Sequence, residues 1–255
     1  MRRSGEPALF QPGAAGFENR IASLLASDLH AELRYTWNQQ RRSFFRRTLL
    51  AGACDAVISV PAALPIVSAT APYFTSAYVF VTRRRDGHPI ASFDDPFLRT
   101  ARIGLQLVGA DGANTPPAMA LARRGITQRI TGFPMWADAG VANPQGRIID
   151  AVASGQIDVA IVWGPFGGYF AKPYADALRL DPIVSDPALP ALAFTYAMAI
   201  GVRKTDPEMR DRLQGALNRH RGEIDAILRL YGIPLVPTAP AAIEAAATGV
   251  SSPTH

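Results

Sequence analysis

LLAGACDAVISV, at residues 49–60, and AVASGQIDVAIVW, at residues 151–163, follow the same plan. Each stretch reads as the end of a helix, a glycine that stops the helix, an aspartate, and an apolar run typical of a buried strand. Helices that alternate with apolar strands indicate an α/β sheet. Because the plan occurs twice, the sequence predicts two similar α/β lobes.

The sequence around these two stretches contains further signals of the same kind. Apolar spacing and turn residues predict helices at 21–29, 42–51, 116–124 and 148–154, and one or two helices within 207–231. They predict strands at 33–37, 56–60, 76–83, 101–108, 158–163 and 196–203. Asn114 or Thr115 is the expected N-cap of the helix that starts at Pro116. The Pro, Ala, Thr and Ser residues after Val236 predict an unfolded tail.

The composition is that of a globular protein. Of the 255 residues 48% are hydrophobic, and the 21 glycines show no three-residue period, which excludes a disordered or collagen-like chain. Lys and Arg number 26 against 21 Asp and Glu, so the formal net charge is +5. The arginine excess has two readings: a surface for acidic partners, or the codon use of a GC-rich genome. The arginines are scattered without a nucleic-acid motif, so we expect no nucleic-acid partner, and the run at 83–85 reads as a solvated loop.

Cysteine usage and hydropathy exclude several further classes. Cys54 is the only cysteine, so the chain by itself cannot close an internal disulfide or build a thiolate metal site. No stretch approaches about 18 consecutive apolar residues, so we expect no membrane-spanning helix. Residues 1–16 carry two arginines but no apolar segment behind them, so they are not a signal peptide as written.

Catalytic motifs are absent from the sequence. The four histidines are scattered and lack the spacing of metal ligands. No nucleophile elbow, P-loop or dinucleotide-binding glycine motif occurs. Asp94 and Asp95 could form a carboxylate pair, but SFDDP at 92–96 more plainly starts a turn or caps a helix. We therefore expect a non-catalytic protein with no cofactor and no metal.

Four segments resemble, in order and spacing, the two-lobe periplasmic solute-binding proteins of ABC importers. They are GFENRIASLLASDL at 16–29, APYFTSAYVFVTRR at 71–84, VASGQIDVAIV at 152–162 and MAIGVRKTDPEMRDRL at 198–213. The resemblance, to family 3 of these substrate-binding proteins, covers 16–236. It implies the type II periplasmic-binding fold, in which each of two lobes is a mainly parallel sheet flanked by helices and two hinge strands join the lobes. It places lobe one at 1–82, lobe two at 83–195, the return to lobe one at 196–236 and a disordered tail at 237–255.

Longer strings resemble a narrower group, the quinoprotein-dehydrogenase-associated binding-protein-like family, which includes the J proteins of methanol dehydrogenase gene clusters. The strings are RYTWNQQRRSFFRRTLLAGACDAVISVPA at 34–62, RIGLQLVGADGANTPPAMALARRGI at 102–126 and VAIVWGPFGGYFA at 159–171. This resemblance implies a periplasmic accessory protein that supports a PQQ-dependent alcohol dehydrogenase. The alternative is a receptor that delivers a small non-amino-acid molecule to an ABC permease. A regulator's effector domain would need a helix-turn-helix, which this sequence lacks.

Two departures from the resemblance shape these expectations. Amino-acid receptors of this fold carry an arginine after the lobe-one strand and an aspartate after the lobe-two strand, whereas this sequence has PAALP at 61–65 and WGPF at 163–166. A zwitterion would lose its hydration without compensation there, so an amino-acid ligand is disfavoured. The family also has a signal peptide and a first strand before the loop PALFQPGAAG at 7–16. We expect the natural chain to start earlier, with a strand that carries a cysteine able to pair with Cys54.

Ligands of two-lobe α/β proteins bind beyond the carboxyl ends of the strands, so the loops after strands nominate the site. The candidates are Phe10, Gln11, Trp37, Gln39, Arg41, Pro61 and Ala62 in lobe one, and Gln106, Asn114, Thr115, Trp163, Gly164 and Pro165 in lobe two.

Several of these candidates have a structural reading beside the functional one. The helix start at Asn114 either holds an oxyanion or is a simple helix cap. Trp163 either contacts a ligand or packs in the core. Four arginines stand close together in and just before the helix predicted at 42–51: Arg41, Arg42, Arg46 and Arg47. Most of them are expected to lie in solvent, and this group is the candidate for contact with an acidic partner.

Overall fold

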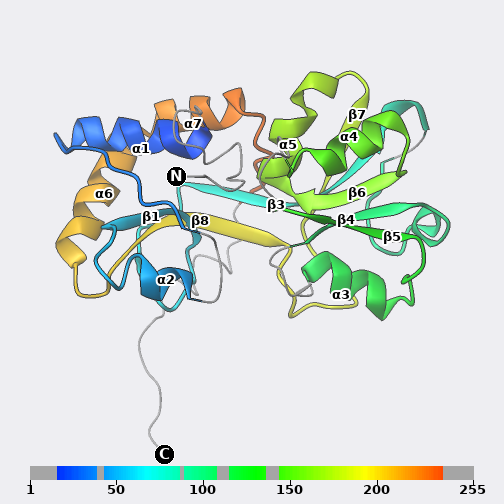
Figure 1. Cartoon of the computed structure of the whole chain (residues 1–255), viewed down its shortest axis with the longest axis horizontal. Helices are drawn as coiled ribbons and strands as arrows, with labels where there is room; N and C mark the ends of the chain where they lie inside the picture. The colour runs from blue at the N-terminus through cyan, green and yellow to red at the C-terminus, as the bar shows by residue number, and fades with distance from the viewer. Residues whose placement is uncertain (1–15, 39–42, 87–88, 108–114, 136–143, 238–255) are drawn as a thin grey trace, which may run out of the picture. The chain divides into compact units, whose positions relative to one another are not determined.

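The computed structural model describes residues 16–38, 43–86, 89–107, 115–135 and 144–237. Within these residues the chain forms two compact units (Figure 1). Unit 1 comprises 16–21, 76–195 and 222–234, and unit 2 comprises 22–75, 196–221 and 235–237. In the described part of the chain, the helices are all too short or too polar to span a membrane.

A mixed five-stranded sheet forms the centre of unit 1. Its order is β5 (Ile130–Pro134), β4 (Ile103–Leu107), β6 (Val159–Trp163), β3 (Phe74–Arg83) and β7 (Leu178–Ile183). β4 runs parallel to β5 and β6, whereas β3 is antiparallel to β6 and β7. Helix α3 (Pro116–Arg123) lies on one face, and α4 (Arg147–Ser154) and α5 (Gly164–Ala171) lie on the other (Figure 1). Three short 3-10 helices complete the unit at Arg84–Asp86, Pro96–Arg99 and Lys172–Tyr174.

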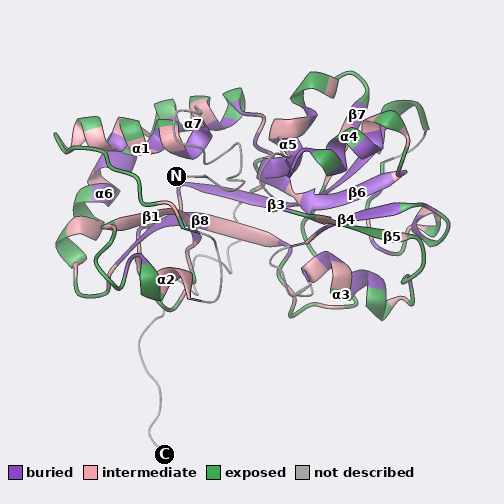
Figure 2. Cartoon of the chain, in the orientation of Figure 1, coloured by how far each residue is buried: buried purple, intermediate pink, exposed green. Residues whose placement is uncertain are grey.

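One buried cluster of unit 1 lies between the sheet and α4. Val79 and Val81 of β3 pack with Ile148 and Val152 of α4, and all ten residues of β3 are buried (Figure 2). A strand that is covered on both faces reads as a continuous apolar run, and the predictions for 76–83, 101–108 and 158–163 are confirmed for this reason.

Unit 2 contains a smaller antiparallel sheet. In it, β8 (Thr195–Val202) pairs with β1 (Ala56–Pro61) and with β2 (Ser68–Ala69). Leu49, Val60 and Val67 form its buried cluster, and α2 (Phe44–Arg47) and α6 (Pro207–Arg219) are its helices. The residues of α1 (Phe17–Asp28) are divided between the units, and α7 (Arg221–Leu230) lies almost wholly in unit 1.

The repeated plan of the sequence ends in the same contacts in both units. In unit 1, Gly155 ends α4 with φ +81°, and Arg83 then fills the turn between helix and strand. Its Nη1 donates to the carbonyl oxygens of Val152 at 2.7 Å and Ile157 at 2.6 Å, and its Nη2 donates to Asp158 at 3.2 Å. The Arg83 side chain is only 9% exposed, so the prediction that this arginine is solvated is wrong. Polar carbonyls at the end of α4 need a buried donor, and Arg83 supplies it.

In unit 2 the corresponding arginine is Arg203, which directly follows β8. Its Nη1 donates to the carbonyl oxygens of Leu49 at 3.4 Å and Cys54 at 2.7 Å, and its Nη2 donates to Asp55 at 2.9 Å. The glycine of this copy is Gly52, with φ +71°. Leu49, Cys54 and Asp55 lie at the same sequence distances from Gly52 as Val152, Ile157 and Asp158 lie from Gly155. The two stretches therefore share a tertiary contact as well as a sequence pattern.

Asp158 makes the stability of unit 1 depend on pH. Hydrogen bonds from the Arg102 side chain, and then from the Arg102 backbone N–H and Arg83, hold the pKa of the Asp158 carboxyl well below its usual range. Its folded pKa is lower than its unfolded pKa, so its stabilisation is complete above the unfolded value and is lost as the pH falls from about 5 towards 1. We expect Asp158→Asn to lower the urea midpoint at neutral pH and to flatten its fall on acidification. Asp176→Asn, at an exposed position, is the control for loss of a charge. An unchanged acid profile for Asp158→Asn would contradict the assignment.

Two secondary-structure predictions for unit 2 are wrong. Residues 33–37 form no strand, because alternation makes a strand only where a neighbour pairs with it, and the described residues provide no such ladder. Thr36 instead donates its hydroxyl to the carbonyl of Ala53 at 2.7 Å. The helix expected at 42–51 is reduced to Phe44–Arg47, because Thr48, at φ −115° and ψ −90°, leaves the helical region. β1 is also only half-buried, with Val60 as its one buried residue.

Candidate functional site

The structure places the predicted site residues as follows. Trp37, Pro61 and Ala62 lie in unit 2, and Gln106, Thr115, Trp163, Gly164 and Pro165 lie in unit 1. Phe10, Gln11, Gln39, Arg41 and Asn114 lie outside the described residues. Each unit is therefore considered by itself.

Gln106 and Trp163 meet at the carboxyl ends of β4 and β6. The backbone pairing of β4 with β6 ends at the pair Leu105–Ile161. Beyond that pair, the side chain of Gln106 on β4 contacts the backbone of β6. Its Oε1 accepts a hydrogen bond from the backbone N–H of Trp163 at 2.9 Å. Gln106 is 4% exposed, and its Nε2 has no hydrogen-bond partner among the described residues. The structure thus brings together two residues that were nominated separately.

Gly164 and Pro165 begin α5 directly after this contact. Trp163 is the N-cap residue, and no side chain caps the helix start. A Cβ on Gly164 would meet the carbonyl oxygen of Ala77 on β3, so glycine is required for the helix to seat here. The Trp163 ring lies edge-on to Tyr78, with centroids 5.6 Å apart, and Trp163 remains partly exposed. The ring thus packs on the sheet and also reaches the surface.

Thr115 is buried at the start of α3 and occupies the N-cap position with extended backbone, φ −71° and ψ 156°. Its side chain makes no capping hydrogen bond, and Pro116 follows at the first helical position. The prediction of an N-cap at Asn114 or Thr115 is therefore confirmed for Thr115 in position, although the side chain does not cap.

The predicted residues of unit 2 are apolar and half-buried. The Ala62 N–H donates to the carbonyl of Ala197 at 2.8 Å, which extends the β1–β8 pairing past Pro61. Trp37 stacks on Tyr35, with ring centroids 5.5 Å apart. Ala62 is thus held against β8, and Trp37 packs against Tyr35.

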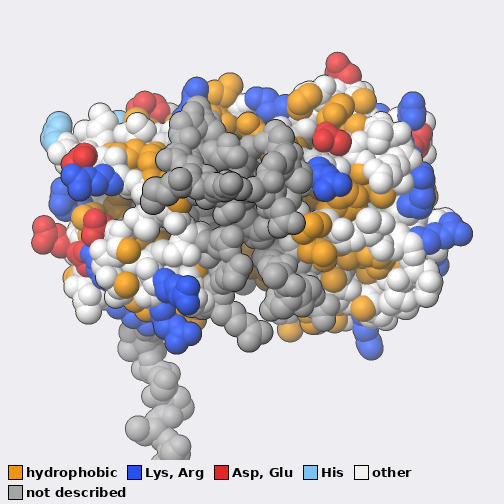
Figure 3. Space-filling model, viewed as in Figure 1, with side chains coloured by type: hydrophobic (Ala, Val, Ile, Leu, Met, Phe, Trp, Pro, Cys, Tyr) orange, Lys and Arg blue, Asp and Glu red, His pale blue; other side chains and the backbone are white. Residues whose placement is uncertain are grey.

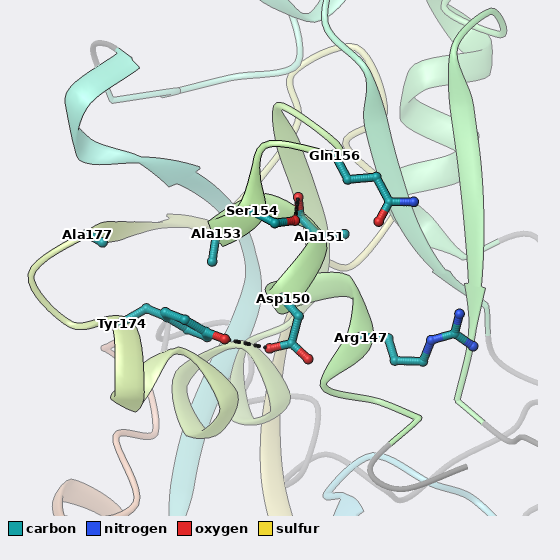
Figure 4. A pocket seen from close by; sticks show the side chains of 8 residues that line it. All are labelled: Arg147, Asp150, Ala151, Ala153, Ser154, Gln156, Tyr174 and Ala177. Atoms are coloured by element: carbon teal, nitrogen blue, oxygen red, sulfur yellow. Dashed lines mark hydrogen bonds between the residues drawn. The ribbon is translucent and has the colours of Figure 1, made fainter.

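A shallow hollow of about 560 Å³ on the outer side of α4 was not predicted from the sequence (Figure 4). It is lined by Arg147, Asp150, Ala151, Ala153, Ser154, Gln156, Tyr174 and Ala177. The Tyr174 hydroxyl donates to Asp150 at 3.0 Å, and the neighbouring carboxylate raises the pKa of Tyr174. Arg147 and Gln156 point away from that pair in Figure 4. No sequence signal could have found this hollow, because its walls come from a helix face and a turn that carry no motif.

The ionisable groups form structural pairs. Asp95 accepts from the Phe97 N–H at 2.9 Å and caps the helix at Pro96–Arg99, while Asp94 binds Arg124 at 2.7 Å, so SFDDP is a cap and an ion pair. Within the described ranges, no three His, Cys, Asp or Glu residues gather as metal ligands would. Burial raises the pKa of the half-buried Cys54 thiol, which makes it a weak nucleophile.

Comparison with known proteins gives one consistent set of relatives. No protein-family model matches the chain. It is 27% identical over 244 residues to Protein MoxJ of Methylorubrum extorquens, which covers 91% of this chain and 79% of MoxJ. The crystal structure of MxaJ from Methlophaga aminisulfidivorans MPT has a TM-score of 0.73 at 22% identity, over 91% of this chain and 97% of MxaJ. At that identity the second likeness shows the shared fold.

The crystal structure of the periplasmic binding protein XoxJ from Methylobacterium extorquens AM1 carries the assignment further. It matches with a TM-score of 0.73 and 30% identity, covering 92% of this chain and 97% of XoxJ. The expected type II periplasmic-binding fold and the resemblance to the J proteins are thereby confirmed. This chain belongs to the family of periplasmic binding proteins that includes XoxJ and MoxJ.

Proposed function

We propose that this protein is a non-catalytic accessory factor that associates directly with a PQQ-dependent, methanol-type alcohol dehydrogenase in the periplasm. The observation that carries the proposal is the likeness to XoxJ and MoxJ over about nine-tenths of the chain. Family membership supports a periplasmic location, association with methanol dehydrogenase systems and a binding role, since binding proteins of this fold are generally non-catalytic.

The chemistry of the strand ends supports this role over amino-acid capture. Pro61 ends β1 and Ala62 follows it, while Gly164 and Pro165 follow β6, where amino-acid receptors carry charged residues. A zwitterion buried against these neutral residues would lose its hydration without a bidentate guanidinium or a counter-ion.

Exposed arginines on α2 are candidates for meeting the dehydrogenase. Arg46 and Arg47 are exposed, in agreement with the expectation that they lie in solvent. On the face visible in Figure 3, the Lys and Arg side chains stand in separate groups and do not form one extended basic surface. A contact with the dehydrogenase would therefore involve a local group of basic side chains, such as the pair Arg46 and Arg47. Such charges act mainly on the association rate and on its salt dependence.

Native mass spectrometry of this protein mixed with the purified PQQ-dependent alcohol dehydrogenase of its own host tests the proposal. We expect a species at the combined mass, weakened by salt. The double variant Arg46→Glu/Arg47→Glu should slow association, whereas Arg212→Glu, an exposed site on α6 of the same unit, should not. Absence of any complex at low salt would reject the accessory function, and a complex that is insensitive to the double variant would reject only this contact.

A further inference from the structure

The outer face of α4 carries two opposite charges that do not neutralise each other. Arg147 and Asp150 are three residues apart on this helix, a spacing at which side chains of opposite charge commonly pair. Here the Asp150 carboxylate instead accepts a hydrogen bond from the Tyr174 hydroxyl at 3.0 Å. Arg147 points away from that pair (Figure 4), and its guanidinium has no hydrogen-bond or ion-pair partner among the described residues. Both charged residues are exposed, so they are available to another molecule.

The two charges border the hollow on the outer side of α4, whose shape and lining favour a protein over a small molecule. Three alanines form the apolar part of its lining: Ala151, Ala153 and Ala177. The polar side chains of Ser154 and Gln156 in the same lining belong to exposed residues. A small ligand would keep much of its surface in water here, whereas sites for small molecules bury most of the ligand. Side chains of an approaching protein fill a shallow hollow while the surfaces around it meet.

The charge pattern of this surface is complementary to itself. When two copies of a chain pair around a two-fold axis, a contact between two different residues occurs twice, once in each direction. If α4 of a second copy lies antiparallel to α4 of the first, Arg147 of each copy lies opposite Asp150 of the other. Two arginines that have no partner in the single chain then form two pairs with carboxylates. The hollow beside Asp150 places the incoming guanidinium near the Tyr174 ring, which favours a cation–π contact.

We propose that the outer face of α4 is a self-association surface, at which a second copy of this chain binds with its α4 antiparallel and Arg147 of each copy pairs with Asp150 of the other. Tyr174 is a positioning residue in this surface, because its hydroxyl holds the Asp150 carboxylate away from Arg147 of the same chain. The net charge of +5 opposes the approach of two copies, so the dimer is weak and forms at high protein concentration. The proposal goes beyond the accessory function, because self-association needs no dehydrogenase.

Sedimentation equilibrium of the full chain, over a wide range of protein concentrations, tests the proposal. We expect the wild type to show a monomer–dimer equilibrium that high salt weakens. Arg147→Asp and Asp150→Arg should each raise the dissociation constant of the dimer by about tenfold or more, because each reversal replaces two attractive contacts by two repulsive ones. Arg229→Asp, at an exposed position of α7, changes the net charge as Arg147→Asp does and is the control. It should dimerise at least as well as the wild type.

A mixture of the two single variants separates a direct contact from an effect on folding or net charge. Across the two-fold axis, the two acidic side chains of Arg147→Asp meet the two basic side chains of Asp150→Arg. The mixture should therefore form a heterodimer about as stable as the wild-type dimer, although each variant alone associates poorly. The double variant Arg147→Asp/Asp150→Arg exchanges the two charges within one chain, and it should dimerise as the wild type does.

Three results would overturn the proposal: a wild-type chain that stays monomeric at every concentration in low salt, a dimer that neither reversal weakens, or a mixture of the single variants that stays monomeric. If the wild type is monomeric and Asp150→Arg instead weakens the complex with the dehydrogenase, the occupant of the hollow is the dehydrogenase and self-association is rejected. The sedimentation measurements use this protein alone, so they stand apart from the test of the accessory function.

Discussion

Arg83→Met is expected to lower the free energy of unfolding by about 3–5 kcal/mol, the usual cost of removing one partner of a buried charged pair. The variant leaves the carbonyl oxygens of Val152 and Ile157 without their donor, and it leaves Asp158 with Arg102 as its remaining arginine. Methionine retains most of the volume and supplies no N–H. Urea unfolding followed by circular dichroism at neutral pH measures the loss.

The other unit supplies the matched control for this prediction. Arg203→Met removes the same set of contacts in unit 2, but this side chain is 24% exposed, so water can replace part of them and the expected loss is about 1–2 kcal/mol. Arg85→Met, at a side chain that is 75% exposed, should stay within about 0.5 kcal/mol of the wild type. A loss for Arg83→Met as small as that for Arg85→Met would show that the buried guanidinium does not stabilise unit 1.

Gly168→Ala is expected to destabilise the protein by about 3 kcal/mol, at the upper end of the range for overpacking a close contact. A Cβ at Gly168 in α5 would collide with the carbonyl oxygen of Gly232 and approach Pro234 Cδ to 2.9 Å. The first obstacle is backbone, which cannot rotate away as a side chain does. Gly232 follows α7 with φ +69°, so that segment is itself held in a conformation that few other residues adopt.

Gly222→Ala is the control for Gly168→Ala. Gly222 lies in α7 with nothing within 4 Å of a Cβ, and alanine is the better helix former, so the variant should be neutral or stabilising by up to about 1 kcal/mol. Thermal unfolding of both variants against the wild type provides the measurement. Equal melting temperatures for Gly168→Ala and the wild type would mean that α5 can move away from Gly232 without cost.

The elements that the sequence predicted well are those whose signal is local. Glycine at the end of α4, proline at the start of α3 and α6, and unbroken apolar runs in β3 and β6 each specify backbone conformation within a few residues. Prediction failed where the secondary structure of a segment depends on contacts with residues far away in the sequence. The alternation at 33–37 has no ladder beside it, and the helix expected at 42–51 stops at Arg47.

The candidate site shows the same division. The rule that sites follow strand ends nominated Gln106 and Trp163 independently, but their hydrogen bond depends on where the β4–β6 ladder stops, which is a property of the folded sheet. β5 and β7, and the hollow on the outer side of α4, were not predicted, because ITGFP at 130–134 and LRLDPI at 178–183 have weak strand signals and gain their pairing from neighbours.

The sequence by itself determined that this chain is an α/β protein with one plan used twice, because helix stop, aspartate and apolar strand are written within a dozen residues each time. Only the tertiary structure decided which arginine donates hydrogen bonds to the carbonyl oxygens at the helix-to-strand turn of each copy. Arg83 and Arg203 lie far along the chain from the turns that they fill, and they reach them because β3 is antiparallel to β6 and β8 is antiparallel to β1. Strand pairing between distant segments sets which donors meet which carbonyls, and local residue patterns carry no record of that pairing.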